Sequence, residues 1–307
     1  MFVDKLIDKI IETKNPTVVG LDPRINLVPD FIKKKHFEIQ EDKIVAETQA
    51  ILEYNMIIID AIKDIIPCIK PQIAFYEAYG LEGLKVFKET IEYAKEMGLM
   101  VIADIKRGDI GSTAEGYAKA YFGQGFVDVD SVTLSPYLGE DSINPFINYC
   151  DQNKGVFILA KTSNGSSGDI QDLSIRGKSV YEIMGELINK WGADYIGNHG
   201  YSSVGAVVGA TYPEEMKILR KIMKKSFFLV PGYGAQGGTA EDIIHCFNED
   251  GLGAIINSSR GIIGAHKKDE NIDKYNDREF HLAIRDSAIK MRDSINNELK
   301  KSKKLAW

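Results

Sequence analysis

The sequence has few cysteines, no long apolar run and no excess of basic residues, and each of these absences excludes a class of protein. Its 307 residues include only Cys68, Cys150 and Cys246, which lie far apart and form no C-x-x-C pair. We therefore expect neither a disulfide framework nor a cysteine-ligated zinc ion. No apolar stretch is long enough to cross a bilayer. The 44 acidic residues outnumber the 38 basic ones, and the net charge of −6 disfavours nonspecific nucleic-acid binding.

Targeting and cofactor signals are also missing. Residues 1–14 are amphipathic and carry acids throughout, without the basic head and apolar middle of a secretory signal. The histidines show neither H-x-H nor H-E-x-x-H spacing, so a histidine metal site is not expected. We expect a cytoplasmic protein with no metal and no cofactor, which binds neither membrane nor nucleic acid.

What the sequence does contain is an alternation of two patterns. Short apolar runs rich in β-branched residues predict strands at 17–22, 67–76, 99–106, 129–135, 155–163, 203–211, 227–232 and 253–260. Stretches with helical periodicity separate them, at 42–66, 81–98, 111–124, 178–191, 213–225, 239–249 and 278–300. Thr239 and Asp242 resemble a capping box at the start of one of these stretches.

Eight strand–helix repeats in a chain of this length favour a single-domain (β/α)8 TIM barrel over residues 1–307. A doubly wound open sheet is the competing architecture, but no G-x-G-x-x-G follows the first predicted strand. No Pro-, Gly- or Ser-rich linker divides the chain. We expect 265–277 to be a polar loop and 301–307 a frayed tail.

The third predicted strand carries the sharpest chemical signal. Asp104 and Lys106 are two residues apart, which places their side chains on the same face of a strand. Asp109 follows in the loop, where it can reach inward or toward a neighbouring subunit, and Lys70 comes from the second strand. Charges in an otherwise apolar strand are costly to bury unless they are paired. The four residues therefore predict a catalytic cluster, with a solvated salt-bridge cluster as the alternative interpretation.

A second signal follows the last two predicted strands. The glycine-rich segment 231–238, which contains Pro231 and Gln236, follows the seventh strand, and Arg260 follows the eighth. Barrels often bind phosphate with these two loops, because glycines let backbone N–H groups approach an anion and arginine offers two parallel donors. We predict a phosphate site here; a plain glycine turn beside a surface arginine is the alternative.

Taken together, these residues resemble the orotidine 5′-phosphate decarboxylase family, in its longer bacterial and protozoan branch. The resemblance extends from residue 18 to about residue 262. Its motifs are Gly20-Leu-Asp22-Pro, Lys70-Pro, Asp104-x-Lys106-x-x-Asp109-Ile110-x-x-Thr113, Pro231-Gly-x-Gly-Ala-Gln236-Gly-Gly and Ser259-Arg260.

The resemblance implies conversion of orotidine 5′-monophosphate to uridine 5′-monophosphate with loss of carbon dioxide and without a cofactor. It also implies a homodimer with shared active sites, in which Asp109, Ile110 and Thr113 reach into the partner subunit's site, and it implies that Lys106 is the proton donor. The substrate contacts that it implies are Asp22 and Lys70 to ribose hydroxyls, Ser163 to the pyrimidine, and Gln236 and Arg260 to the phosphate. Pro231, at the start of the glycine-rich segment, is a further expected substrate-binding residue.

The chemistry of the cluster suits this reaction. Loss of carbon dioxide from C6 of the pyrimidine leaves a carbanion without an ordinary electron sink, so the protein must stabilise charge electrostatically and deliver a proton. A lysine held between aspartates stays protonated for that purpose. Phosphate binding could drive closure of the 231–238 loop. Two other functions remain open at this point: a metal-assisted sugar-phosphate barrel enzyme with the same D-x-K-x-x-D motif, and a non-catalytic nucleotide-binding protein.

Overall fold

The computed structural model describes residues 1–123, 125–234 and 237–307, and its centre is a closed parallel barrel. Going round the barrel, the strand order is β1-β10-β9-β8-β5-β4-β3-β2. The fold confirms the predicted (β/α)8 TIM barrel, and each of the eight predicted runs contributes one strand. The barrel strands are β1 (Thr17–Leu21), β2 (Cys68–Pro71), β3 (Met100–Arg107), β4 (Ser131–Leu134), β5 (Gly155–Lys161), β8 (Ser202–Val208), β9 (Ser226–Val230) and β10 (Ala254–Ser258).

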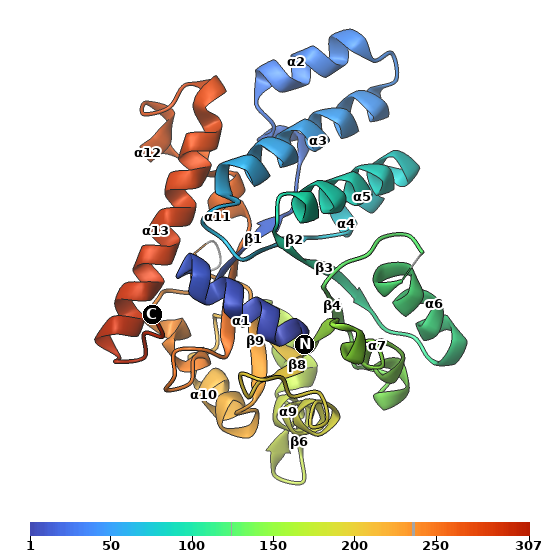
Figure 1. Ribbon diagram of the computed structural model, residues 1–307, viewed down its shortest axis with the longest axis vertical. Coiled ribbons are helices and arrows are strands. Elements are labelled where there is room, and N and C mark those ends of the chain that lie inside the picture. Colours follow the sequence, from blue (N-terminus) through green and yellow to red (C-terminus); the bar gives the residue numbers. More distant parts are fainter. Residues whose placement is uncertain (124, 235–236) are drawn as a thin grey trace.

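Helices surround the barrel (Figure 1). The described α-helices are α1 (Phe2–Thr13), α2 (Asp30–Ile39), α3 (Lys43–Ile62), α4 (Ala74–Glu77), α5 (Gly80–Glu96), α6 (Gly111–Phe122), α7 (Asn144–Ile147), α8 (Gly168–Gln171), α9 (Val180–Trp191), α10 (Pro213–Ile222), α11 (Arg260–Ile263), α12 (Asp269–Ile272) and α13 (Phe280–Lys301). Between α8 and α9 a two-stranded hairpin is formed by β6 (Ser174–Ile175) and β7 (Lys178–Ser179).

The sequence of α3 supplies both a cap and an apolar stripe. In α3, the Asp42 carboxylate accepts hydrogen bonds from the backbone N–H groups of Ile44 and Val45, at 2.7 and 3.1 Å. These bonds satisfy donors that the first helical turn leaves free. Ile51 and Ile58 then lie on the buried side of the helix, in the large core cluster between the helices and the barrel wall.

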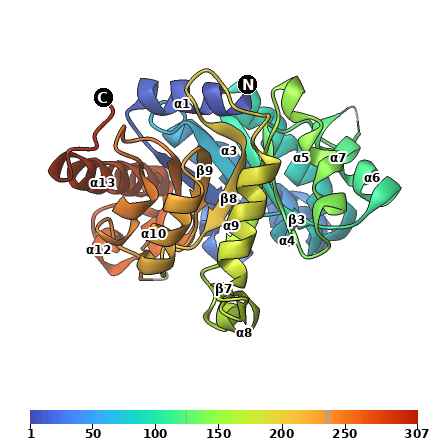
Figure 2. The same cartoon turned by 90° about the horizontal axis from the view of Figure 1, so that it is seen from below.

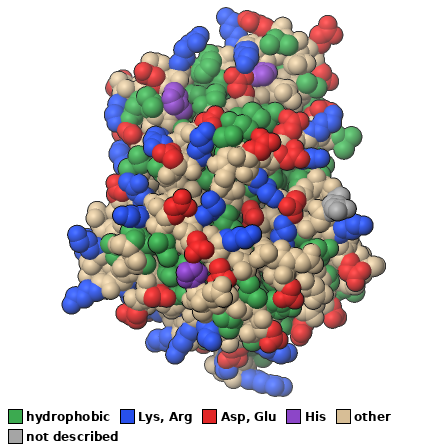
Figure 3. All heavy atoms as spheres, viewed as in Figure 1, with side chains coloured by type: hydrophobic (Ala, Val, Ile, Leu, Met, Phe, Trp, Pro, Cys, Tyr) green, Lys and Arg blue, Asp and Glu red, His purple; other side chains and the backbone are tan. Residues whose placement is uncertain are grey.

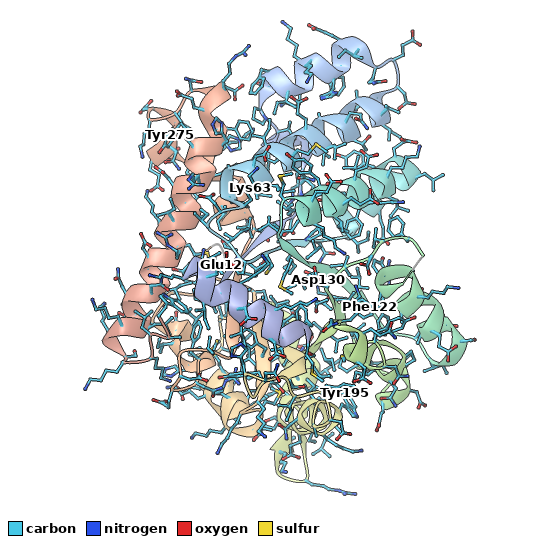
Figure 4. All side chains as sticks on the ribbon, in the orientation of Figure 1. Glu12, Lys63, Phe122, Asp130, Tyr195 and Tyr275 are labelled. Carbon is cyan, nitrogen blue, oxygen red and sulfur yellow. The ribbon has the colours of Figure 1, made fainter. Side chains whose placement is uncertain are left out.

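Helix α1 closes the end of the barrel at which the strands begin. At the amino ends of the strands, Phe2, Leu6 and Ile7 of α1 are buried in a second apolar cluster, and the Phe2 ring meets the Phe157 ring edge-on at 6.2 Å. Figure 2 shows α1 on one side of the barrel and the α8–β7 lobe projecting from the opposite side. Asp130, labelled in Figure 4, accepts a hydrogen bond from the Val101 N–H at 2.8 Å near the amino end of β3. The α1 end is therefore a packed, structural end.

Charges of both signs are interspersed over the face on which α1 lies (Figure 3). In the part of the chain that the structure describes, no helix is long and apolar enough to span a membrane. Within the same ranges, no three His, Cys, Asp or Glu side chains gather in a way that could hold a metal ion.

The predicted helix over 239–249 is wrong in type. The capping box does form, since the Thr239 N–H donates to the Asp242 carboxylate at 2.8 Å and the Asp242 N–H donates to the Thr239 hydroxyl at 3.3 Å. However, only a 3₁₀ helix, η5 (Asp242–Cys246), follows. The Cys246 carbonyl accepts a hydrogen bond from the buried Arg220 side chain instead of continuing a helix, and Phe247 turns to extended backbone.

Two segments that flank α13 are more ordered than the sequence predicts. The segment 265–277, expected as a polar loop, contains α12 and the 3₁₀ turn Ala265–Lys267. The Asn271 side chain donates a hydrogen bond to the Ala265 carbonyl at 2.8 Å, which ties these turns together. Residues 301–307, expected as a frayed tail, lie against the body of the protein. Leu305 and Trp307 are partly buried there against the apolar core.

Candidate active site

An irregularity in β3 places the catalytic candidates. The register between β3 and β4 shifts between Ala103 and Arg107, and Lys106 has a φ of 46°, in the left-handed region that few non-glycine residues adopt. The backbone N–H groups of Ile105 and Lys106 both donate to the Thr133 hydroxyl at 3.0 Å. This β4 side chain therefore holds the bulge in place and sets the direction of Lys106.

The predicted cluster forms a continuous chain of charged contacts. The Asp104 carboxylate lies between two lysines: one oxygen is 2.6 Å from Lys70 Nζ and the other is 2.5 Å from Lys106 Nζ. The Thr133 hydroxyl donates to the second oxygen at 2.9 Å. Lys70 and Asp104 are buried, whereas the side chain of Lys106 is 45% exposed. Lys106 is thus the member of the cluster that an incoming molecule can reach.

Opposing effects fix the charge of this cluster. Burial alone would raise the pKa of Asp104, but the positive charges of Lys70 and Lys106 outweigh it and hold that pKa far below its usual value. Burial would also lower the pKa of Lys70, and the negative charges of Asp104 and Asp22 reverse the effect and raise it. Both groups therefore stay ionised across the neutral pH range.

A cavity of about 510 Å³ opens on one side of the cluster. Its polar lining includes two side-chain oxygens, Asp22 Oδ1 and Asn257 Oδ1, that are buried without a hydrogen-bond partner among the described residues. Such atoms are costly unless something binds them. The cavity is lined by Asp22, Arg24, Asn26, Leu27, Lys70, Asp104, Pro231, Gly232, Tyr233, Asn257, Ser258, Ser259 and Arg260. We call it the arginine chamber, because it contains two arginines.

A second cavity of about 410 Å³ opens on the other side. It combines an apolar floor with hydroxyl and amide side chains, and its lining residues are Lys70, Asp104, Lys106, Thr133, Leu159, Thr162, Ser163, Asn164, Gln171, Val207, Leu229 and Pro231. We call it the amide chamber. Lys70, Asp104 and Pro231 line both chambers, so the charged cluster lies where they meet. Such a pair suits a ligand with an anionic end and a polar ring.

The structure brings most of the predicted residues to these chambers, but not all of them. Asp109, Ile110 and Thr113 line neither chamber; Asp109 is half-buried, and its carboxylate accepts from the Ile110 N–H at 2.8 Å. Ile110 and Thr113 are exposed. Among the ion pairs of the described residues, the acidic partner of Lys106 is Asp104. Gln236 lies outside the described residues.

Several lining residues were missed by sequence reasoning. Thr133 was a detectable case, because a hydroxyl inside the apolar run of β4 has to find a partner. Arg24 belongs to the loop after β1, and its guanidinium lies 5.1 Å from the centre of the Phe75 ring, a contact that no local pattern reveals. Gln171 reaches the amide chamber from α8, outside every predicted strand.

Comparison with known proteins supports one reaction. A model of the orotidine 5′-phosphate decarboxylase / HUMPS family matches residues 18–275. An orotidine 5′-phosphate decarboxylase of Clostridium perfringens is 45% identical over 98% of this chain and all of its own length. That of Clostridium acetobutylicum is 46% identical over 97% of this chain, again over its full length. The solved OMP decarboxylase of Leishmania donovani is 31% identical, with a TM-score of 0.74 over 96% of this chain and 97% of its own.

Proposed function

Because this chain belongs to the orotidine 5′-phosphate decarboxylase family and decarboxylates orotidine 5′-monophosphate to uridine 5′-monophosphate, the last step of de novo pyrimidine nucleotide synthesis, we propose that Lys70, Asp104 and Lys106 carry the reaction. The observation that carries this proposal is the position of the cluster, at the junction of the two chambers. The near full-length match to the curated decarboxylases decides against the two other functions left open by the sequence.

The nucleotide lies across the junction in this proposal. Its phosphate enters the arginine chamber, where Arg260 is exposed and in a position to bind it. Asp22 and Lys70 bind ribose hydroxyls; Asp22 Oδ1, which has no hydrogen-bond partner in the part of the chain that the structure describes, is an acceptor of the kind that a hydroxyl needs. The pyrimidine enters the amide chamber beside Ser163. Pro231, which lines both chambers, packs at the middle of the substrate, and Gln236 adds a phosphate contact.

The chemical step uses the exposed end of the cluster. The bond between C6 and the carboxylate carbon breaks, carbon dioxide leaves, and the electron pair stays on C6. The Lys106 ammonium stabilises this developing charge and then transfers a proton to C6; the neutral amine regains a proton from solvent. Asp104 keeps the ammonium in place, because one of its carboxylate oxygens lies 2.5 Å from Lys106 Nζ.

Positioning must contribute most of the remaining acceleration. A well-placed proton donor typically contributes about 10²- to 10⁴-fold. Binding of the distant phosphate supplies energy that holds C6 against Lys106. This is why the arginine chamber belongs to the catalytic machinery although the bond that breaks lies at the cluster.

We also propose a homodimer with shared active sites. Asp109 and Ile110 lie in the β3–α6 connection and Thr113 in the first turn of α6, all outside both chambers of their own chain, and Ile110 is an exposed apolar side chain. A second copy that buries this surface would bring Asp109 into its partner's amide chamber. We further propose a cytoplasmic location without a metal or cofactor; the three cysteines are buried free thiols, as in a reducing compartment.

A mixed dimer tests both parts of the proposal. Lys106→Ala and Asp109→Ala chains, each inactive alone, are mixed, and carbon dioxide release from orotidine 5′-monophosphate is measured in the presence of a chelator. If Asp109 acts in the partner's site, a mixed dimer contains one intact site and recovers up to half of the wild-type activity per dimer. Absence of recovery, with mixed dimers demonstrated by mass spectrometry, would refute the shared site.

A further inference from the structure

The wall of the amide chamber is built by an excursion of the chain after β5. Between Lys161 and α9 the chain forms the 3₁₀ turn Gly165–Ser167, α8 and the β6–β7 hairpin. This lobe projects from the face of the barrel opposite α1, where the βα loops meet (Figure 2). It returns Gln171 to the chamber beside Thr162 and Ser163. None of the sequence motifs assigns it a role.

The Gln171 amide is held in one orientation. The Thr162 N–H donates to Gln171 Oε1 at 2.9 Å, and Gln171 Nε2 donates to the Thr162 hydroxyl at 2.8 Å. Because a backbone N–H can only donate, this pair settles which end of the amide is oxygen. The Thr162 hydroxyl in turn donates to Asn164 Oδ1 at 2.7 Å. A primary amide has two donors and two acceptor lone pairs, so Gln171 keeps one of each after these bonds.

An ion pair between a buried lysine and a half-exposed aspartate fixes the residue next to Gln171. The side chain of Lys161 is fully buried, and its Nζ lies 2.5 Å from Asp172 Oδ1. The same ammonium lies 4.4 Å from the centre of the Tyr212 ring and 5.6 Å from that of Tyr181. The pairing of β5 with β8 shifts between Leu159 and Lys161, so Leu159 lines the chamber while Lys161 points to Asp172. The ion pair therefore links the residue that follows α8 to the end of β5.

We propose that Gln171 recognises the pyrimidine ring and that the Lys161–Asp172 pair is the positioning device that holds it in place. The proposal deepens the proposed function, because it assumes that the ring occupies the amide chamber. A pyrimidine-2,4-dione presents a carbonyl, an N–H and a second carbonyl along one edge. One free N–H and one free carbonyl lone pair on Gln171 match two adjacent groups of that edge. Lys161 and Asp172 act only through Gln171 and touch no substrate.

The test separates the ring from the rest of the nucleotide. Dissociation constants are measured by calorimetry for uridine 5′-monophosphate and for ribose 5-phosphate, which lacks the ring, together with kcat and KM for orotidine 5′-monophosphate. We expect Gln171→Ala to weaken uridine 5′-monophosphate binding by roughly 3- to 10-fold, the range for loss of a neutral hydrogen bond. Ribose 5-phosphate binding should not change. The matched control is Gln152→Ala, which removes an exposed glutamine far from either chamber.

The positioning role is tested by a double-mutant cycle. Asp172→Asn should also weaken uridine 5′-monophosphate binding. In the double variant it should add little to the loss of affinity caused by Gln171→Ala, because both substitutions act on one contact. Additive losses would overturn the positioning role. Wild-type affinity in Gln171→Ala, or an equal loss for ribose 5-phosphate, would overturn recognition by Gln171. If Asp172→Asn does not fold, the Lys161→Met, Asp172→Leu pair replaces it, because it leaves no buried charge unpaired.

These outcomes are distinct from a failure of the function itself. Carbon dioxide release by the wild-type chain tests the decarboxylase function, whereas the ratio of the two affinities tests Gln171 alone.

Discussion

Two buried cationic clusters, at opposite ends of the barrel, satisfy their charges in different ways. At the cluster end, Lys70 is neutralised by Asp104, which also contacts the half-exposed Lys106. At the amino ends of the strands, Arg220 is buried and forms no ion pair with any carboxylate of the described residues. Its guanidinium donates to the backbone carbonyls of Cys246, Met223, Ser226 and Gly253 at 2.7–2.9 Å and lies 3.6 Å from the centre of the Phe228 ring.

The difference shows which buried charge serves chemistry. The guanidinium N–H groups of Arg220 donate to backbone carbonyls that are fixed in place. Burial lowers the pKa of Arg220 to about 10, which still leaves the side chain charged at neutral pH. It therefore joins loop ends and has a structural role. The Lys70–Asp104–Lys106 cluster instead ends in an ammonium that faces a cavity, so its last charge is available to a ligand. Mutations at the two ends should separate activity from stability.

The largest effect is expected from Lys106→Ala. It removes the proton donor, and we expect kcat for carbon dioxide release to fall at least about 10³-fold. Because the side chain is half-exposed, the thermal midpoint should change little and uridine 5′-monophosphate should still bind. A steady-state assay with a melting curve measures both. Near-normal turnover would refute the role of Lys106 and with it the contrast between the two clusters.

Asp104→Asn should affect stability in a pH-dependent way. Since the pKa of Asp104 is lowered in the folded protein, its stabilising contribution is complete above its ordinary pKa of about 4 and is lost as the pH falls from there toward the folded value. At pH 7 the variant leaves Lys70 buried without its partner, which we expect to cost about 3–5 kcal/mol of unfolding free energy. Urea unfolding at several pH values should show that the difference in unfolding free energy between wild type and variant becomes smaller below about pH 4. A difference that does not depend on pH would contradict an ionised Asp104.

Arg220→Met should lower stability and leave activity unchanged, the reverse of the effects expected for Lys106→Ala. It leaves buried carbonyls without their donors, at a cost of about 1–3 kcal/mol for each group that finds no new partner. We expect a loss of roughly 3 kcal/mol in unfolding free energy, while folded protein keeps its kcat. Urea unfolding and an active-site-normalised assay measure these quantities. A large loss of kcat in fully folded variant would show that the amino end is coupled to catalysis.

Arg260→Ala should have the smallest effect of the four, and it tests whether phosphate binding contributes to the chemical step. Loss of a charged hydrogen bond costs about 1.5–3 kcal/mol, or roughly 10- to 100-fold in kcat/KM. We expect kcat and KM both to change for the nucleotide, and little change for orotidine, which lacks the phosphate. A change in KM alone would mean that phosphate binding energy does not reach the transition state.

The sequence predicts the barrel and the charged cluster because both depend on local patterns. Each strand is a short run of neighbouring apolar residues, and Asp104 and Lys106 lie two residues apart within one strand. The failures are long-range. Thr239 and Asp242 form their capping box, yet only a 3₁₀ helix follows, and where it ends the Cys246 carbonyl accepts a hydrogen bond from Arg220, 26 residues earlier in the chain.

The rest of the site could not be predicted for a similar reason. Gln171 reaches the amide chamber because Asp172 pairs with Lys161, 11 residues earlier in the chain, at a strand irregularity that has no sequence signature. The left-handed backbone of Lys106 depends in the same way on a hydroxyl of the neighbouring strand.

Proton exchange at C6 of the product reports directly on Lys106 as the proton donor. If Lys106 delivers the proton, the reverse transfer must also pass through Lys106, so wild-type protein in D₂O should replace the C6 proton of uridine 5′-monophosphate with deuterium. Proton NMR follows the C6 signal at saturating nucleotide. We expect slow loss of this signal with the wild type and no loss above background with Lys106→Ala, although the nucleotide is bound. Exchange by the variant at the wild-type rate would refute Lys106 as the proton donor.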